Sequence, residues 1–253
     1  MRIGIAGMTG RMGRLLIEES RAAGHEVVGG TVRNAPPPDG LPVFSLPDLA
    51  ASADVVIDFT HASTAALHAE TMARSGTPWV LGTSGLSASD ESAVDQAAET
   101  IPVVYAANFG PGITLLLALA RQLGAALPAE QYDAEIVEMH HRQKVDAPSG
   151  TAMALGRAVA EGRGVQLKSV MQSGRDGHTG PRPPGAIGFA ALRGGQVVGE
   201  HTLLFAAAGE QIALSHRALD RRAFAAGAVR AARWMEGRAP GLYGMADVMG
   251  LQP

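Results

Sequence analysis

Short apolar runs alternate with amphipathic segments over about the first 109 residues of the chain. The continuous apolar centre of ADVVIDF is typical of a strand that is buried on both faces. The predicted strands are Arg2–Ala6, His25–Val32, Ala53–Phe59, Pro78–Gly82 and Ile101–Ala106, and the predicted helices are Arg11–Ala23, Ser63–Ser75 and Ser87–Glu99. This alternation predicts an α/β fold with a Rossmann-like, doubly wound parallel sheet and right-handed crossovers.

The pattern changes after residue 112. The next predicted elements are a helix over Ile113–Leu127, a strand near Ala134–Met139 and a helix that begins at Ser149. From Gly185 to Ser215 the chain is mostly strand-like, and Gly194-Gly195 is expected to form a hairpin turn. The Gly- and Pro-rich stretch Gly174–Pro184 lacks periodicity and is expected to be a long loop. This half predicts an α+β domain with a mainly antiparallel sheet.

The last segment with helical spacing is Asp220–Glu236, which could pack back on the first domain. We therefore predict one domain made of residues 1–109 with 220–253, and a second made of residues 110–219.

Composition and charge exclude several classes of function. The net charge of −3 gives no attraction for nucleic acid or for an anionic membrane, so neither partner is expected. The longest apolar run, Ile113–Ala120, is far shorter than the ~20 residues that a membrane span needs. The amino-terminal segment breaks at once into glycines, unlike a signal peptide, and we expect a cytoplasmic protein. The absence of Cys excludes disulfides, thiolate metal sites and cysteine nucleophiles.

A glycine loop, Gly7-Met8-Thr9-Gly10-Arg11-Met12-Gly13, joins the first predicted strand to the first predicted helix. Glycine permits a tight turn and lets a pyrophosphate approach the exposed amides at a helix amino terminus. The spacing is GxxGxxG rather than the dehydrogenase GxGxxG. The evidence for dinucleotide binding is therefore the position of the loop at the start of an α/β pattern, more than its spacing. The loop predicts dinucleotide binding, and a plain structural turn is the alternative.

The residue after the second strand normally separates NAD from NADP binding, since an acidic side chain there holds the ribose 2′-hydroxyl. This chain has Arg33 at that place, followed by Asn34, and no carboxylate occurs before Asp39. Arg33, with help from Arg11, could pair with a 2′-phosphate. We therefore expect a preference for NADPH, with NADH tolerated; a solvated surface arginine is the alternative.

The densest polar cluster lies between Glu138 and Ala152, where His140, His141, Arg142 and Lys144 are four potential cations. Pro148 imposes an extended approach, and Ser149 can cap a helix over Gly150–Glu161. The first amides of that helix could hold a substrate carboxylate, and a neighbouring histidine could exchange a proton near neutral pH. A solvated basic loop is the alternative. No metal site is expected, because adjacent histidines share no face of a regular element and no Cys supports them.

Taken together, these motifs resemble the dihydrodipicolinate reductase family of the diaminopimelate and lysine pathway. The resemblance covers nearly the whole chain, and the stretch His140–Thr151 is its most specific part. The matching motifs are GMTGRMG at Gly7–Gly13, VIDFT at Val56–Thr60, GTSG at Gly82–Gly85, AANF at Ala106–Phe109, EMHHRQKVDAPSGTA at Glu138–Ala152, GHTGPRPPGAIGFAALRGG at Gly177–Gly195, VGEHTLLFA at Val198–Ala206 and FAAGAVRAARW at Phe224–Trp234.

The resemblance implies an NAD(P)H-dependent reduction of 4-hydroxy-tetrahydrodipicolinate, a small dicarboxylate, to tetrahydrodipicolinate. It implies a Rossmann-like cofactor domain and a substrate domain that also forms a homotetramer. His140 falls on the position of the proton donor and acceptor and Lys144 on that of a second proton donor. Substrate-binding positions are His141, Gly150 and Thr151, with Ser149 beside them, and cofactor-binding positions are Gly7, Met8, Thr9, Gly10, Arg11, Met12, Gly82, Thr83, Ser84, Ala106, Ala107, Asn108 and Phe109. Many members carry Glu or Asp where Arg33 stands, so a preference for NADH does not transfer.

Two other interpretations stay open at this point. Another two-domain reductase of amino-acid metabolism is possible, although semialdehyde dehydrogenases need a catalytic Cys that is absent here. Homoserine-type dehydrogenases do not explain the His140–Thr151 stretch. A non-catalytic dinucleotide sensor would bind the cofactor without turnover and would leave His140, His141 and Lys144 without a purpose.

Overall fold

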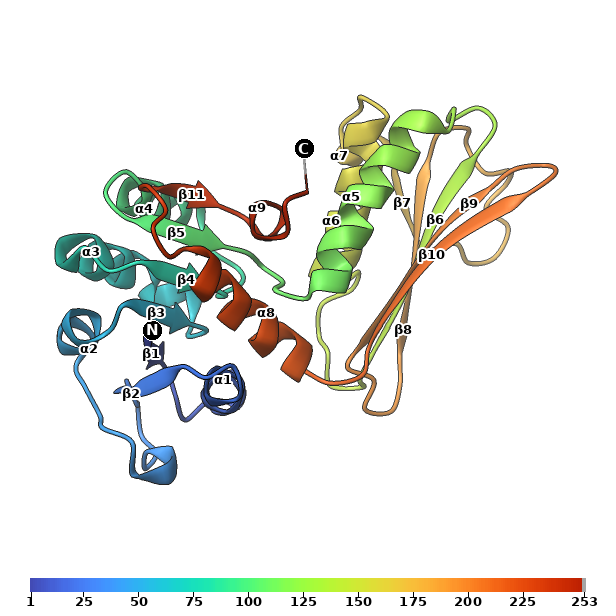
Figure 1. Ribbon diagram of the computed structural model, residues 1–253. Coiled ribbons are helices and arrows are strands. Elements are labelled where there is room, and N and C mark those ends of the chain that lie inside the picture. The colour runs from blue at the N-terminus through green and yellow to red at the C-terminus, as the bar shows by residue number, and fades with distance from the viewer. Residues whose placement is uncertain (252–253) are drawn as a thin grey trace. The chain divides into compact units, whose positions relative to one another are not determined.

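The computed structural model describes residues 1–251 and divides the chain into two compact units (Figure 1). The first unit contains Met1–Pro111 and the segment that starts at Arg221, and the second contains Gly112–Asp220. Among the described residues, no helix has the length and apolar character that a membrane span requires.

The first unit is built on a six-stranded parallel sheet with the strand order β11-β5-β4-β3-β1-β2. Its strands are β1 (Arg2–Ala6), β2 (Glu26–Gly30), β3 (Val55–Asp58), β4 (Trp79–Leu81), β5 (Pro102–Tyr105) and β11 (Gly241–Tyr243). Its helices are α1 (Arg11–Ala22), α2 (Leu46–Ser52), α3 (Ala65–Ser75), α4 (Ala88–Ala98), α8 (Arg222–Trp234) and α9 (Met245–Met249), with short 3-10 turns at Pro38–Gly40 and Ala62–Thr64.

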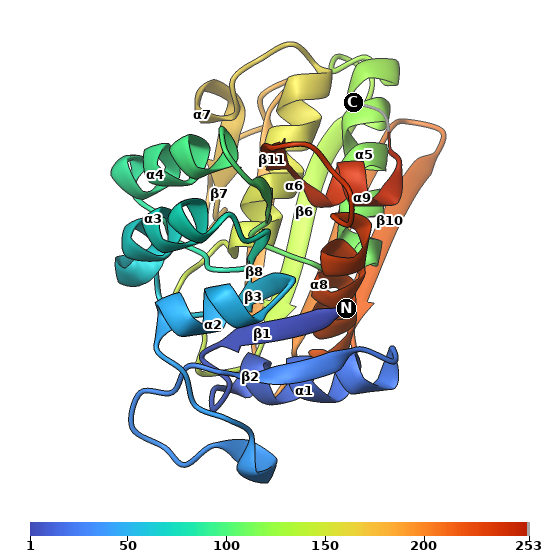
Figure 2. The ribbon, with the colours of Figure 1, turned by 60° about the vertical axis from the view of Figure 1, so that its left-hand side comes forward.

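Side chains of the sheet alternate between two apolar cores, as the period of a strand requires. Ile3 and Ile5 of β1 belong to the core beneath α1, α8 and α9, whereas Ala6 belongs to the core beneath α2, α3 and α4. Helices therefore cover both faces, and Figure 2 shows α3 and α4 side by side on one of them. This arrangement confirms the predicted Rossmann-like, doubly wound sheet.

Several short elements of the first unit were not predicted. Strand β11 has only three residues, too few to show a period, and it extends the sheet by pairing in parallel with β5. Helix α2 has seven residues, with Ser45 accepting a hydrogen bond from the Asp48 amide as its cap. Both are shorter than the window over which apolar periodicity can be recognised.

The second unit has a five-stranded mixed sheet with the order β10-β9-β6-β8-β7. Its strands are β6 (Asp133–His140), β7 (Met171–Ser173), β8 (Ile187–Arg193), β9 (Gly199–Ala206) and β10 (Gln211–Ala218), and its helices are α5 (Pro111–Ala126), α6 (Gly150–Gly162) and α7 (Leu167–Val170). An apolar core fills the space between one face of the sheet and the helices, with Ile136, Leu203 and Phe205 among its buried side chains. The stretch 174–184 has no regular element, as predicted.

The predicted hairpin at Gly194-Gly195 is wrong. Strand β6 lies between β8 and β9, pairing in parallel with β8 and antiparallel with β9, so the glycine turn connects two strands that are not neighbours. The sheet accordingly has two parallel and two antiparallel pairings instead of being mainly antiparallel. Period-2 patterns reveal strands but do not reveal which strands pair, and this is why the sequence did not predict the order.

Candidate active site

The glycine loop of the first unit forms a tight turn at the end of β1. Gly7 has a φ of 74°, and its carbonyl accepts a hydrogen bond from the Gly10 amide at 3.0 Å. A Cβ on Gly13 would lie 2.3 Å from the Gly7 oxygen and 2.6 Å from the Met8 Cα, both backbone atoms. Only glycine therefore fits at position 13, which lets α1 start directly against the loop.

The amino terminus of α1 fits the pyrophosphate of a dinucleotide. The helix begins at Arg11, its capping residue Gly10 provides no side-chain hydrogen bond, and the first turn contains no acidic residue. The loop is fixed from β2, because Thr31 Oγ1 accepts from the Gly7 amide at 2.9 Å and the Thr31 carbonyl accepts from the Met8 amide at 3.1 Å. Free amides at a rigid helix amino terminus, without a competing carboxylate, are suited to an anion.

The other predicted cofactor residues follow the carboxyl ends of neighbouring parallel strands. Arg33 comes after β2, Gly82–Ser84 after β4 and Ala106–Phe109 after β5. The carboxyl ends of parallel strands meet at one edge of the sheet, which is where such folds bind ligands. Arg33 is exposed, and no ion pair of Arg33 is found within residues 1–251.

Aromatic packing holds this edge together. The ring of Phe59, which follows β3, lies 5.4 Å from the ring of Phe109. A Cβ on Gly82 would come within 2.3 Å of the Phe59 ring, so the glycine after β4 allows this ring to fit.

Asp58, at the end of β3, is a buried carboxylate that lies within the VIDFT motif but to which the sequence assigned no role. It accepts hydrogen bonds from His68 Nδ1 at 2.6 Å, the Thr60 amide at 2.9 Å and the Thr60 hydroxyl at 2.6 Å. Thr60 is thereby fixed beside the glycine loop, where its methyl group would meet a Cβ on Gly7 at 3.0 Å.

In the second unit, the end of β6 carries Glu138 and His140 on its buried face, since residues two apart in a strand point the same way. Glu138 Oε2 lies 2.6 Å from His140 Nδ1. The same carboxylate accepts from Arg193 Nη1 at 2.9 Å, from Arg193 Nη2 at 2.8 Å and from the Ser149 amide at 3.1 Å. β6, the end of β8 and the start of α6 therefore meet at one buried carboxylate.

This network determines the pKa values of both groups. Burial raises the pKa of Glu138, but hydrogen bonds from Arg193 and His140 outweigh it, and the net pKa lies below the ordinary value. Burial lowers the pKa of His140 below its ordinary value, and the charge of Glu138 opposes this effect. The result is an ionised carboxylate behind an imidazole that can exchange a proton.

His201 of β9 lies against this pair. Its ring packs edge-on against the His140 ring at 5.1 Å, and its Nε2 lies 3.0 Å from Ser149 Oγ. Burial lowers the pKa of His201 to about 4, so this ring is neutral near pH 7. Ser149 Oγ also accepts from the Ala152 amide at 3.2 Å and caps α6, as predicted from the sequence.

The loop between β6 and α6 carries the remaining predicted residues. Lys144 Nζ forms an ion pair with Asp146, at 2.7 and 2.9 Å from its two carboxylate oxygens. The His141 amide donates to the Val197 carbonyl at 2.8 Å, which attaches the loop to the turn before β9. Gly150 and Thr151 form the first turn of α6, and no acidic residue lies in that turn. The structure thus gathers His140, His141, Lys144 and the start of α6 in one region of the second unit.

Comparison with known proteins covers both units. The model of "Dihydrodipicolinate reductase, N-terminus" matches residues 1–109, and that of "Dihydrodipicolinate reductase, C-terminus" matches residues 112–249. The 4-hydroxy-tetrahydrodipicolinate reductase of Granulibacter bethesdensis is 64% identical over 100% of this chain and 98% of its own length. The chain belongs to the dihydrodipicolinate reductase family.

Two further relatives agree with this membership. The 4-hydroxy-tetrahydrodipicolinate reductase of Gluconacetobacter diazotrophicus is 62% identical over 99% of this chain and 98% of its own. A solved structure of dipicolinate-bound dihydrodipicolinate reductase from Paenisporosarcina sp. TG-14 is 26% identical, with a TM-score of 0.78, and covers 98% of each chain. The family and fold predicted from the sequence are therefore confirmed, as is the class of nicotinamide-dependent oxidoreductase.

Three residues of this second-unit cluster were not predicted from the sequence: Glu138, Arg193 and His201. All three lie within family motifs that gave them no separate role, and Arg193 is 55 residues beyond Glu138 in the chain. Glu138 could have been predicted from the sequence, because Ala134, Ile136, Glu138 and His140 occupy every second position and so share one face of the strand. An acidic residue on an otherwise apolar face indicates a partner.

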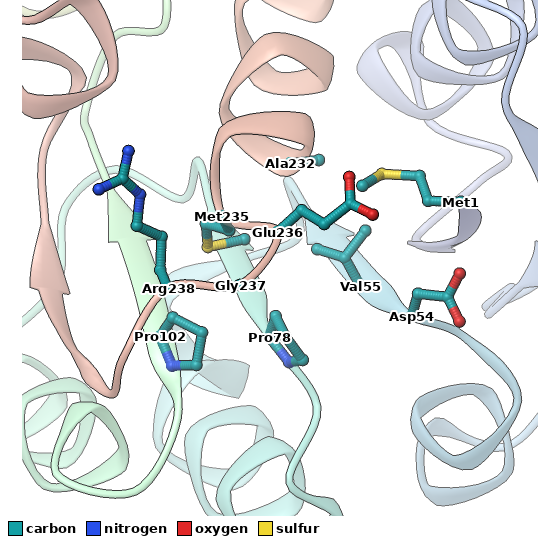
Figure 3. A pocket seen from close by; sticks show the side chains of 10 residues that line it. All are labelled: Met1, Asp54, Val55, Pro78, Pro102, Ala232, Met235, Glu236, Gly237 and Arg238. Atoms are coloured by element: carbon teal, nitrogen blue, oxygen red, sulfur yellow. The ribbon is translucent and has the colours of Figure 1, made fainter.

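The first unit also has a pocket with a volume of about 290 Å³, and none of the predicted site residues line it (Figure 3). Asp54 and Val55 at the start of β3 and Pro102 at the start of β5 border it. It therefore opens at the amino ends of the strands, whereas the glycine loop follows the carboxyl end of β1. We do not assign the cofactor or the substrate to it.

The glycine loop yields a prediction about cofactor binding. Gly13→Ala should weaken NADPH binding about 10-fold or more, because its Cβ would displace backbone atoms that position the α1 amides. Titration calorimetry with NADPH measures the effect. Gly209→Ala is the matched control, since a Cβ there meets nothing within 4 Å and its φ is not positive. Equal affinity of the Gly13→Ala variant and the wild type would contradict the assignment of the loop.

Proposed function

We propose that this protein reduces 4-hydroxy-tetrahydrodipicolinate to tetrahydrodipicolinate in the diaminopimelate and lysine pathway, with loss of the 4-hydroxyl group as water, using NADPH in preference to NADH. Membership in the dihydrodipicolinate reductase family supports the reaction class. The observation that carries the proposal is the second-unit cluster, in which a proton-exchanging His140, a lysine and a helix amino terminus lie together.

The cofactor is assigned to the first unit, and when bound it supplies the hydride. The amides at the start of α1 would hold its pyrophosphate. The loops after β4 and β5, residues 82–84 and 106–109, would line the rest of the dinucleotide site at the same edge of the sheet.

The proton is assigned to His140. Its Nδ1 is bonded to Glu138, so Nε2 is the atom that gives the proton to the substrate. Lys144 would act as a second donor and stabilise negative charge on the substrate, exchanging its ion pair with Asp146 for a contact with the substrate.

The substrate carries two carboxylates, and the second unit offers two kinds of anion receptor. The first comprises the side chains of His141 and Lys144, and the second is the start of α6 at Gly150 and Thr151, with Ser149 as its cap. The Paenisporosarcina relative has a dicarboxylate, dipicolinate, bound to it, which supports a dicarboxylate class of ligand here.

The preference for NADPH rests on Arg33. This exposed side chain follows β2, where an acidic residue would hold the ribose of NADH. Its guanidinium is suited to a 2′-phosphate, whose charge an acidic residue would repel.

We further propose a homotetramer that forms through the open face of the second sheet, and a cytoplasmic location, where reduced nicotinamide cofactors are available. The helices cover one face of this sheet, while Val137 and Leu192 on the other face are 39% and 52% exposed. Burial of such apolar side chains against a second copy would favour association.

The test of the reaction is a coupled assay in which a synthase generates the substrate from pyruvate and aspartate semialdehyde. NADPH oxidation that depends on this protein is expected, with a higher kcat/KM for NADPH than for NADH. Arg33→Asp should reverse that ratio, because the carboxylate would bind the ribose hydroxyl and repel a 2′-phosphate. Absence of oxidation by folded, NADPH-binding protein would contradict the reductase assignment, and an unchanged ratio in the variant would contradict only the role of Arg33.

The proton-transfer residues can be tested in the same assay. His140→Ala and Lys144→Ala should each lower kcat by roughly 10²–10⁴, the range for general acid catalysis, and leave the Kd for NADPH nearly unchanged. Lys168→Ala removes an exposed lysine of α7 and serves as the control. Wild-type turnover of both variants would refute these roles.

A further inference from the structure

We propose that Glu138 is a positioning residue for proton transfer, whose buried carboxylate fixes the His140 ring in one tautomer and one orientation, with Nε2 toward the substrate. The inference rests on the role proposed above for His140 and adds a residue to which neither the resemblance nor the comparisons assign a part.

The contact between the two side chains defines the tautomer. Glu138 is 1% exposed and its pKa is lowered, so an ionised oxygen faces His140 Nδ1 at 2.6 Å. An ionised carboxylate can only accept a hydrogen bond, so Nδ1 must carry the proton in the neutral ring. Nε2 is then the position that gains and loses a proton.

Space at Nε2 is provided by a glycine on the neighbouring strand. A Cβ on Gly199 of β9 would lie 3.0 Å from His140 Nε2 and 3.4 Å from Cδ2. The shorter distance is too small for an unstrained contact, so a larger residue would force the ring to move. Within residues 1–251, Nδ1 has Glu138 as its partner and no second hydrogen-bond partner of this ring is found.

Glu138 itself is held rigidly enough to orient another group. Arg193 binds both carboxylate oxygens, and the Ser149 amide binds Oε1. Arg193 Nη2 also donates to the Asp146 carbonyl at 2.6 Å, so the loop that carries Lys144 is attached to the same guanidinium. These donors already satisfy a buried carboxylate structurally, and His140 is an additional partner that needs a separate reason.

The charges around His140 determine how its pKa responds to a loss of Glu138. Burial, Lys144 and Arg193 lower this pKa, and Glu138 is the group that raises it. His201, on β9, adds no charge near pH 7 because its pKa is about 4. Neutralising Glu138 therefore lowers the pKa of His140 further. As the pH rises, His140 then loses its proton, and with it the ability to act as a proton donor, at a lower pH than in the wild type.

The first experiment measures the pH dependence of kcat for Glu138→Gln, which keeps the shape of the side chain and removes its charge. The variant should lose kcat by about 10- to 100-fold, the range seen for partners behind metal-ligating histidines, with an unchanged Kd for NADPH. The alkaline limb of its kcat profile should move to lower pH. Glu138→Asp, which retains the charge, should keep that limb nearer to its wild-type position.

Glu135→Gln is the matched control. Glu135 lies on the same strand but on the opposite face, where it pairs with Arg175 and Arg182. Because Glu135 shares its face with Val137, which is proposed above to lie in the tetramer interface, the variant is first shown by analytical ultracentrifugation to keep the wild-type oligomeric state. Loss of its charge should then leave kcat and the pH profile near those of the wild type. Equal effects of the two Glu→Gln variants would overturn the proposal, since they would reflect only the stability of β6.

The double variant His140→Ala/Glu138→Gln separates this proposal from the proposed function. If Glu138 acts through His140, the double variant should be no slower than His140→Ala alone, whereas independent roles would multiply the losses. Wild-type turnover of His140→Ala would refute the role of His140. A slow His140→Ala variant beside a Glu138→Gln variant with wild-type kcat would refute only the role of Glu138. If Glu138→Gln does not fold, the wild-type protein decides the question: a neutral His140 ring that carries its proton on Nε2 would overturn the proposal.

Discussion

The organisation of the second unit depends on the need to compensate one buried negative charge. An ionised carboxylate without partners in a protein interior costs several kcal/mol, so the chain must bring donors to Glu138. Those donors come from three places: the end of β8 with Arg193, the start of α6 with the Ser149 amide, and β6 itself with His140. One electrostatic requirement therefore brings the proposed proton donor and the proposed carboxylate receptor together.

The first unit is organised by a constraint of the backbone instead. Because its strands are parallel, all the loops after their carboxyl ends meet at one edge, whatever their sequence separation. Gly13 then lets α1 begin in contact with the loop, since even a Cβ would overlap the Gly7 carbonyl. Asp58 and the Phe59–Phe109 pair add side-chain contacts that fix this edge.

The sequence predicted those features that depend on local pattern. Period and glycine context were enough for the parallel sheet, α1 with its loop and the cap of α6 at Ser149. Pairing between segments far apart in the chain could not be predicted from local pattern. Nothing in the sequence of β6 shows that it lies between β8 and β9, and Arg193 is 55 residues from Glu138. The structure is needed to distinguish a structural glutamate from a positioning one, because the distinction depends on the burial of the side chain and on the donors that surround its carboxylate.

The most direct test of how this site is organised is the tautomer of the neutral His140 ring, measured by ¹⁵N NMR on the uniformly labelled wild-type protein. The ring is assigned by difference from His140→Gln and observed above its pKa. A carboxylate acceptor at Nδ1 predicts a protonated Nδ1 and the chemical shift of a lone-pair nitrogen at Nε2. A neutral ring that carries its proton on Nε2, or that exchanges between both tautomers, would contradict the claim that Glu138 organises this site.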